Sequence, residues 1–106
     1  MSYEFTDPFL VRRVTPERIA AAEADVAALT SAAQFSDFWR ARLVVLRAYV
    51  IAATENQAEA GDLYAEKIAH YSREYDRALV QARAQAQAAQ AGSAGAQMYS
   101  VPIARA

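Results

Sequence analysis

Apolar residues recur at alternating steps of three and four along most of this chain, which is the period of an amphipathic helix. Three segments carry the pattern. The first segment places apolar residues at Ile19, Ala22, Val26, Leu29 and Ala33. The second places them at Trp39, Leu43, Leu46, Val50 and Ala53, widened by Phe38, Val45, Tyr49 and Ala52. The third places them at Tyr64, Ile68, Tyr71, Tyr75, Ala78 and Ala82, flanked by Leu63 and Leu79. The pattern predicts three helices that share one core.

Two helix starts are marked by local signals. Thr15-Pro16-Glu17 combines an N-cap residue, a proline suited to the first helical position and an acid in the first turn. Ser36-Asp37 is a second cap signal, only a few residues beyond the first helix. Such short connections favour antiparallel neighbours.

These signals predict an all-α fold: a three-helix antiparallel hairpin or bundle with a long C-terminal helix and extended N- and C-terminal arms. The domain boundaries that we expect are an N-terminal arm over residues 1–14, a helical domain over 15–91 and an extended tail over 92–106. The expected helices span about 16–33, 37–55 and 58–91, and the second, most apolar helix forms the centre.

The third helix is expected to be longer than its hairpin partner. A helix over 58–91 spans about 50 Å, more than a third longer than the second helix. Its last turns, rich in Ala and Gln, therefore protrude or pack on another molecule. We expect Gly92-Ser93-Ala94-Gly95 to end the helix as a flexible joint, followed by an apolar peptide.

The apolar residues outside the predicted core are candidates for binding a partner. In the tail, Tyr99, Val101 and Ile103 alternate as in a strand, and Pro102 is tolerated at a sheet edge, so the peptide is suited to strand addition. In the arm, apolar residues surround the helix-disfavouring Asp7-Pro8 pair. The full set of predicted contact residues is Tyr3, Phe5, Phe9, Leu10, Arg83, Met98, Tyr99, Val101, Pro102 and Ile103.

Composition excludes several classes of protein. The chain has 106 residues, no cysteine and a net charge of −1, which argues against a disulfide framework, a thiolate metal site and a general attraction to nucleic acid or anionic membrane. No apolar run approaches a membrane span, and the acidic first residues differ from a secretory signal. We therefore expect a protein that is made in the cytoplasm and does not enter a membrane.

Catalytic and metal sites find little support. His70 is the only histidine, and no nucleophile has a candidate base nearby. Asp62, Glu66 and His70 fall at steps of four and would share a helix face that suits a metal, but solvated helix faces often carry such charges. We expect no catalytic residue, no metal and no cofactor.

Arginines provide a weak case for nucleic-acid binding. Arg73 and Arg77 share a face of the third helix, but Glu74 and Asp76 are interleaved with them, which favours ion pairs along or between helices. A recognition helix has a denser basic stripe in a net positive domain. The sequence still allows a role in which arginines line a passage through which DNA travels without being bound specifically.

Three stretches together resemble the small helical head–tail connector, or adaptor, proteins of tailed bacteriophages. They are the Thr15-Pro16-Glu17-Arg18 helix start, the central segment 38–53, and the segment 65–79 with its Tyr71, Tyr75, Ala78 and Leu79 spacing. The resemblance covers about Thr15 to Ala86. Family members often have four or more helices, whereas this chain predicts three.

The resemblance implies a structural subunit of the virion neck rather than an enzyme. It implies a homo-oligomeric ring, commonly a dodecamer, located at the head–tail junction between the portal protein and the next neck or tail protein, with DNA passing through non-specifically. Whether the place is that of adaptor, stopper or tail-completion protein stays open. The alternative is a non-enzymatic helical interaction module, either a phasin-like coat protein or a helix-in-groove binder.

Overall fold

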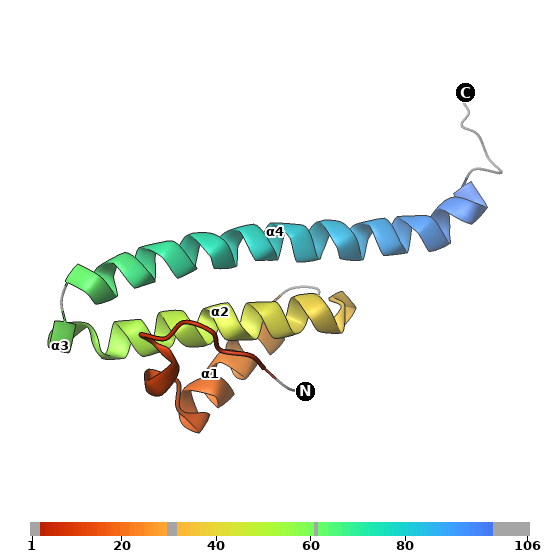
Figure 1. Ribbon diagram of the computed structural model, residues 1–106. Helices are drawn as coiled ribbons and strands as arrows, with labels where there is room; N and C mark the ends of the chain where they lie inside the picture. Colours follow the sequence, from red (N-terminus) through yellow and green to blue (C-terminus); the bar gives the residue numbers. More distant parts are fainter. Residues whose placement is uncertain (1–2, 30–31, 61, 99–106) are drawn as a thin grey trace.

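The computed structural model describes residues 3–29, 32–60 and 62–98, and these form an all-α bundle without a strand. Three long helices dominate: α1 (Pro16–Ala27), α2 (Asp37–Glu55) and α4 (Asp62–Met98). Short helical turns lie between and before them: η1 (Val11–Arg13), η2 (Ala32–Gln34) and α3 (Gln57–Ala60). Helix α2 is central, with α4 antiparallel along one side and α1 against the other (Figure 1).

The two predicted helix starts are confirmed. The Thr15 hydroxyl accepts a hydrogen bond from the Arg18 amide at 3.3 Å, and Pro16 occupies the first position of α1. The Ser36 hydroxyl accepts from the Trp39 amide, also at 3.3 Å, and α2 has the predicted bounds. These caps satisfy amides that have no partner within the helix, so local chemistry fixes where both helices begin.

Two other predicted boundaries are wrong. Helix α1 ends at Ala27 rather than near residue 33, because the chain tightens there: the Leu29 amide donates to the Val26 carbonyl at 3.1 Å, a three-residue step that closes the helix. At its far end, α4 continues to Met98, so the joint expected at Gly92–Gly95 lies inside the helix. Glycine costs only about 1 kcal/mol per residue in a helix relative to alanine, so strong helix formers around it can sustain the helix.

The predicted third helix also begins differently. It is divided into the single turn α3 and the long α4, whereas one continuous helix from residue 58 was expected. Asn56, which is buried, turns the chain at the end of α2: its amide and its side chain both donate to the Ala52 carbonyl, at 3.2 and 2.8 Å. These two hydrogen bonds to one carbonyl end α2 and set the direction of the turn.

Helix α2 supplies half of the buried apolar residues in the described segments, more than any other element, in line with its apolar composition. Its buried residues are Leu43, Val44, Val45, Leu46, Ala48, Tyr49, Ala52 and Ala53. Facing them, α4 contributes Tyr64 and then small residues at Ala78, Ala82 and Ala86, which let the two helices approach closely. Phe38 differs from the prediction: its side chain is 69% exposed rather than part of the core.

Helix α4 is much longer than the element it packs against. At about 1.5 Å per residue, its 37 residues span roughly 55 Å, whereas the 19 residues of α2 span roughly 29 Å. The last buried side chain described on α4 is Ala86, and Gln87, Ala88 and Ala89 are exposed. Beyond Ala86 the helix continues for about 18 Å to Met98, past the beginning of α2 (Figure 1).

Candidate functional site: a pinned arm and a projecting helix

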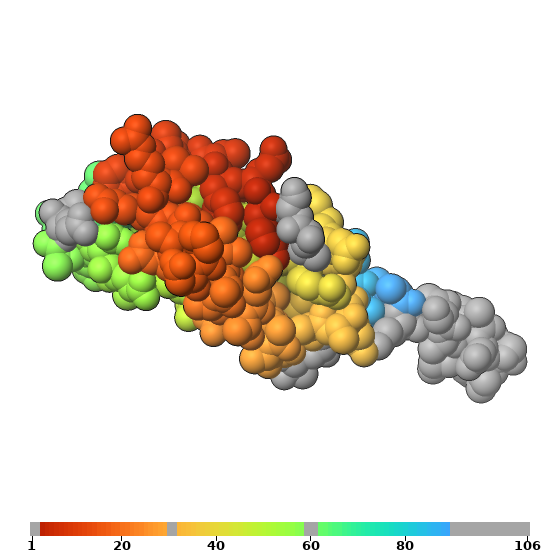
Figure 2. Space-filling view, turned by 90° about the horizontal axis from the view of Figure 1, so that it is seen from below, coloured from red at the N-terminus to blue at the C-terminus, as the bar shows by residue number. Residues whose placement is uncertain are grey.

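The N-terminal arm packs against its own chain. Seen from below, the arm and α1 cover α2, and α4 emerges at one end (Figure 2). Leu10 is fully buried, the Phe5 ring meets Tyr49 edge-on at a centroid distance of 5.6 Å, and the Phe9 ring lies 5.0 Å from that of Tyr64. The prediction of an extended arm whose apolar residues pack under a neighbour is therefore wrong for Leu10, which has no surface left to offer.

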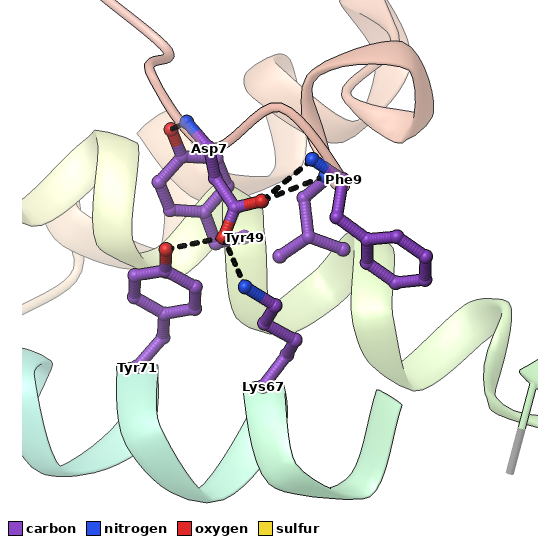
Figure 3. A network of polar contacts seen from close by, with 6 residues as sticks. Asp7, Phe9, Tyr49, Lys67 and Tyr71 are labelled. Atoms are coloured by element: carbon purple, nitrogen blue, oxygen red, sulfur yellow. Dashed lines mark hydrogen bonds and ion pairs between the residues drawn. The ribbon is translucent and has the colours of Figure 1, made fainter. Parts of the chain in front are cut away.

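The carboxylate of Asp7 is the centre of the arm's attachment (Figure 3). One carboxylate oxygen accepts hydrogen bonds from the amides of Phe9 and Leu10, at 2.8 and 3.0 Å. The other accepts from the Lys67 ammonium at 2.8 Å and from the Tyr71 hydroxyl at 2.5 Å. The amide of Asp7 itself donates to the Tyr49 hydroxyl at 2.9 Å. One buried residue thus ties the arm to both α2 and α4.

The electrostatics of this network favour a carboxylate that is ionised near neutral pH. Burial alone would raise the pKa of Asp7, but the hydrogen bonds from Lys67, Tyr71 and the two amides outweigh it and lower the pKa to about 2. Burial and the same carboxylate raise the pKa of the Tyr71 hydroxyl above its ordinary value. Each carboxylate oxygen already accepts two hydrogen bonds, so Asp7 is neither a free metal ligand nor a base near neutral pH. The network is a structural clamp.

A second contact holds the beginning of the arm. The Tyr3 hydroxyl donates to the Glu23 carboxylate on α1 at 2.6 Å. Burial, followed by this hydrogen bond and the negative charge of Glu23, raises the pKa of Tyr3 to about 12. Tyr3, Phe5 and Phe9 are all half-buried, so each retains some surface for a further contact.

The remaining predicted contact residues lie toward the far end of α4 or beyond it. Arg83 is half-buried on α4, one residue after the buried Ala82. Met98 is the last residue of α4, and its side chain lies outside the described part of the chain. Tyr99, Val101, Pro102 and Ile103 also lie outside the described residues. The structure therefore brings the arm residues together on the core and leaves α4 to project separately.

Charged side chains on the helices are largely engaged with one another. Arg47 pairs with Asp25 at 2.7 Å, joining α2 to α1, and Glu74 lies 3.0 Å from Arg77 and 3.8 Å from Arg42. The expected ion pairs along and between helices are thus present for Glu74. In the same way, Arg18 of α1 pairs with Glu55 at the end of α2, at 2.6 Å.

The helix face that carries Asp62, Glu66 and His70, which the sequence does not favour as a metal site, has no support as one in the described residues. Asp62, Glu66 and His70 are exposed on α4, and no group of three acidic or histidine side chains in the described segments is arranged to hold a metal ion. No helix among the described residues is long and apolar enough to cross a membrane.

The clamp residues were missed from the sequence. The sequence indicates Asp7 only as part of a helix-disfavouring pair with Pro8 and Tyr71 only as a core aromatic, and no pattern in it assigns a role to Lys67. The available signal was local: an Asp before Pro whose side chain accepts from amides two and three residues later is a typical turn. That signal predicts the bonds to Phe9 and Leu10, but not those to α4.

Comparisons with protein-family models, with curated proteins and with solved structures found no match.

Proposed function

We propose that this protein is a non-catalytic structural subunit of a repeated assembly, and specifically a connector in the neck of a tailed phage particle. The observation that carries the proposal is the length of α4 relative to α2. Helix α4 continues for about 18 Å beyond Ala86, the last of its described side chains that is buried, and runs past the beginning of the helix against which it packs (Figure 1). Most helical stability in proteins comes from packing of one helix face against other elements. A helix end that projects from its own subunit is therefore typical of a surface that another subunit covers.

The clamped arm supports the same class of function. Asp7 and the aromatic contacts fix the arm to the hairpin, so the body of the subunit is a rigid platform from which α4 projects. A rigid body with one projecting element is suited to repeated head-to-tail contacts. Such contacts close into a ring when the rotation between neighbours closes.

The absence of a catalytic arrangement in the described residues is consistent with this role. The one polar cluster that is buried has its carboxylate saturated with hydrogen bonds, and His70 is exposed. The resemblance described above then gives the assembly: a ring, with twelve copies as the reference number, at the head–tail junction. There it would contact the portal on one side and the next neck protein on the other, with DNA passing through the centre.

The test is the mass and shape of the assembly. The purified full chain, alone and mixed with a portal ring from the same genome, is measured by native mass spectrometry and by electron microscopy. We expect a fixed number of copies in a ring with a central opening. Binding to granules or to a single partner helix without fixed stoichiometry would instead support the coat or helix-in-groove alternative. A chain that stays monomeric even with the portal ring would contradict the proposal.

A further inference from the structure

A groove of about 540 Å³ lies where α1, η2 and the beginning of α2 meet. Its walls are small and apolar: Val26 and Ala27 from α1, Ala32 from η2, and Val44 from α2. Glu23 and Arg40 also line it, together with Tyr3 of the clamped arm. A cavity of this size accommodates one or two aliphatic side chains of a partner.

The two charged residues of the groove differ in how they are satisfied. The Arg40 guanidinium donates to the Phe35 carbonyl at 3.0 Å and lies 3.5 Å from that of Ala32. Glu23 accepts only the neutral Tyr3 hydroxyl, and no basic side chain in the described ranges pairs with it. The groove therefore fits an apolar segment that carries a cation.

The last residues of the chain have this composition. Val101, Ile103 and Arg105 alternate, so in an extended peptide their side chains lie on one side, with neighbours of the set about 7 Å apart. Arg105 is the single charged side chain after Met98. An aliphatic pair followed by one cation complements an apolar groove that holds the Glu23 carboxylate, which has no basic partner among the described residues.

Chain length decides which copy of the groove is within reach. Trp39, next to Arg40 on α2, lies beside Ala78 and Gln81 of α4, so the groove is level with this part of α4. From Gln81 to Met98 the helix advances about 26 Å. The stretch from Met98 to Ile103 spans at most about 18 Å when fully extended. Helix α1, which supplies Val26 and Ala27 to the groove, lies on the side of α2 away from α4 (Figure 1). Ile103 therefore cannot return to the groove of its own chain.

We propose that the segment Val101–Arg105 of one copy occupies this groove on a neighbouring copy. Ile103 lies against Val26 and Val44, and Arg105 pairs with Glu23. The inference rests on the proposed role as an assembly subunit and names the contact between its copies. Because the donor segment and the acceptor groove are different surfaces, the contact is heterologous and repeats from copy to copy.

Disulfide trapping tests this contact in the full chain, which has no cysteine of its own. Ala27→Cys and Ile103→Cys are combined in one chain, and the assembled protein is oxidised mildly. Ala27 is exposed and lines the groove, so the substitution leaves the core intact. The matched control combines Ile103→Cys with Ala24→Cys, because Ala24 is exposed on the same helix without lining the groove. We expect a ladder of covalent multimers on a non-reducing gel from the first variant and at least tenfold less from the control.

Charge exchange is the second measurement. Glu23→Lys and Arg105→Glu each weaken association of the copies by about two- to fivefold, the range of an exposed ion pair, and the combined variant recovers it. A covalent monomer with an internal disulfide would overturn the inference. So would equal ladders from both cysteine variants. An assembly of fixed mass that gives no ladder would overturn this contact while leaving the proposed function standing. A chain that forms no assembly with the portal ring and no ladder would overturn both.

Discussion

The Lys67 ammonium donates to the Asp7 carboxylate at 2.8 Å, joining two residues that are 60 positions apart in the sequence. The Asp7 side chain is almost completely buried, and that of Lys67 is about one quarter exposed. This ion pair joins the hydrogen bond from Tyr71 to Asp7 and the ring contact of Phe9 with Tyr64 in fixing the arm to the last helix.

Replacement of Asp7 by alanine should destabilise the fold strongly. It leaves Lys67 without its partner and removes the acceptor of two amides, so we expect the free energy of unfolding to fall by about 2 to 4 kcal/mol. Asp76→Ala is the control, because Asp76 is exposed on the same helix as Lys67, and it should change stability by less than about 0.5 kcal/mol. Urea unfolding followed by circular dichroism measures both. Equal losses in the two variants would contradict the clamp.

The ionisation of Asp7 should make stability depend on pH in the acid range. Its pKa falls from 3.8 to about 2 on folding, so the ionised form favours the folded state. The contribution of about 2 kcal/mol is complete above about pH 5 and is lost as the pH falls through 2. We expect the urea midpoint of the wild-type chain to drop over this range more steeply than that of Asp7→Asn. Parallel curves for the two chains would show that other carboxylates account for the acid sensitivity.

The two most buried tyrosines should respond differently to loss of the hydroxyl. Tyr49→Phe leaves the buried Asp7 amide without an acceptor, at a cost of about 1 to 3 kcal/mol. Tyr64 is 2% exposed, and no group in the described segments hydrogen-bonds its hydroxyl. Tyr64→Phe should therefore be neutral or slightly stabilising. Thermal melts of both variants give the comparison, and a larger loss for Tyr64→Phe would contradict the assignment of the bond to Tyr49.

The close approach of α2 and α4 should depend on small side chains. Ala82 is fully buried, so Ala82→Leu should overpack this contact and destabilise the subunit by about 1 to 3 kcal/mol. Ala84→Leu adds the same volume at an exposed position of the same helix and should be nearly neutral. Chemical unfolding of the two variants distinguishes them. A neutral Ala82→Leu would mean that the helices can separate there at little cost.

Removal of residues 93–106 should separate stability from assembly. The last buried side chain described on α4 is Ala86, so the midpoint of thermal unfolding should stay within about 2 °C of that of the full chain. The assembled mass in native mass spectrometry should fall to that of the single subunit. A truncated chain that assembles normally would mean that the contacts between copies lie elsewhere.

Local signals in the sequence predict the elements but not the clamp. Thr15 and Ser36 fix two helix starts, because a cap acts over three residues and needs no tertiary context. The end of α1 and the continuation of α4 past Gly92 depend on small energy differences between competing backbone conformations, so composition alone does not decide them. Phe38 follows the helical period, yet its side chain is mostly exposed.

The clamp could not be predicted because its partners are distant in sequence. The chain has one lysine and twelve acidic residues, so the sequence does not show which acid pairs with Lys67. Tyr49 on α2 and Lys67 and Tyr71 on α4 meet at Asp7 of the arm, and only the packed structure brings these three segments to one point. The projecting end of α4 could be predicted from the sequence, because it follows from comparing the lengths of two helices.

The separation between Asp7 and Lys67 also orders events during synthesis. At about 5 to 20 residues per second, a ribosome adds Lys67 roughly 3 to 12 s after Asp7. Throughout that interval the nascent arm can pack only against the helices already made, and Asp7 lacks its partner Lys67. The arm that carries Asp7 is therefore made first but docks late, once the first turns of α4 have left the exit tunnel.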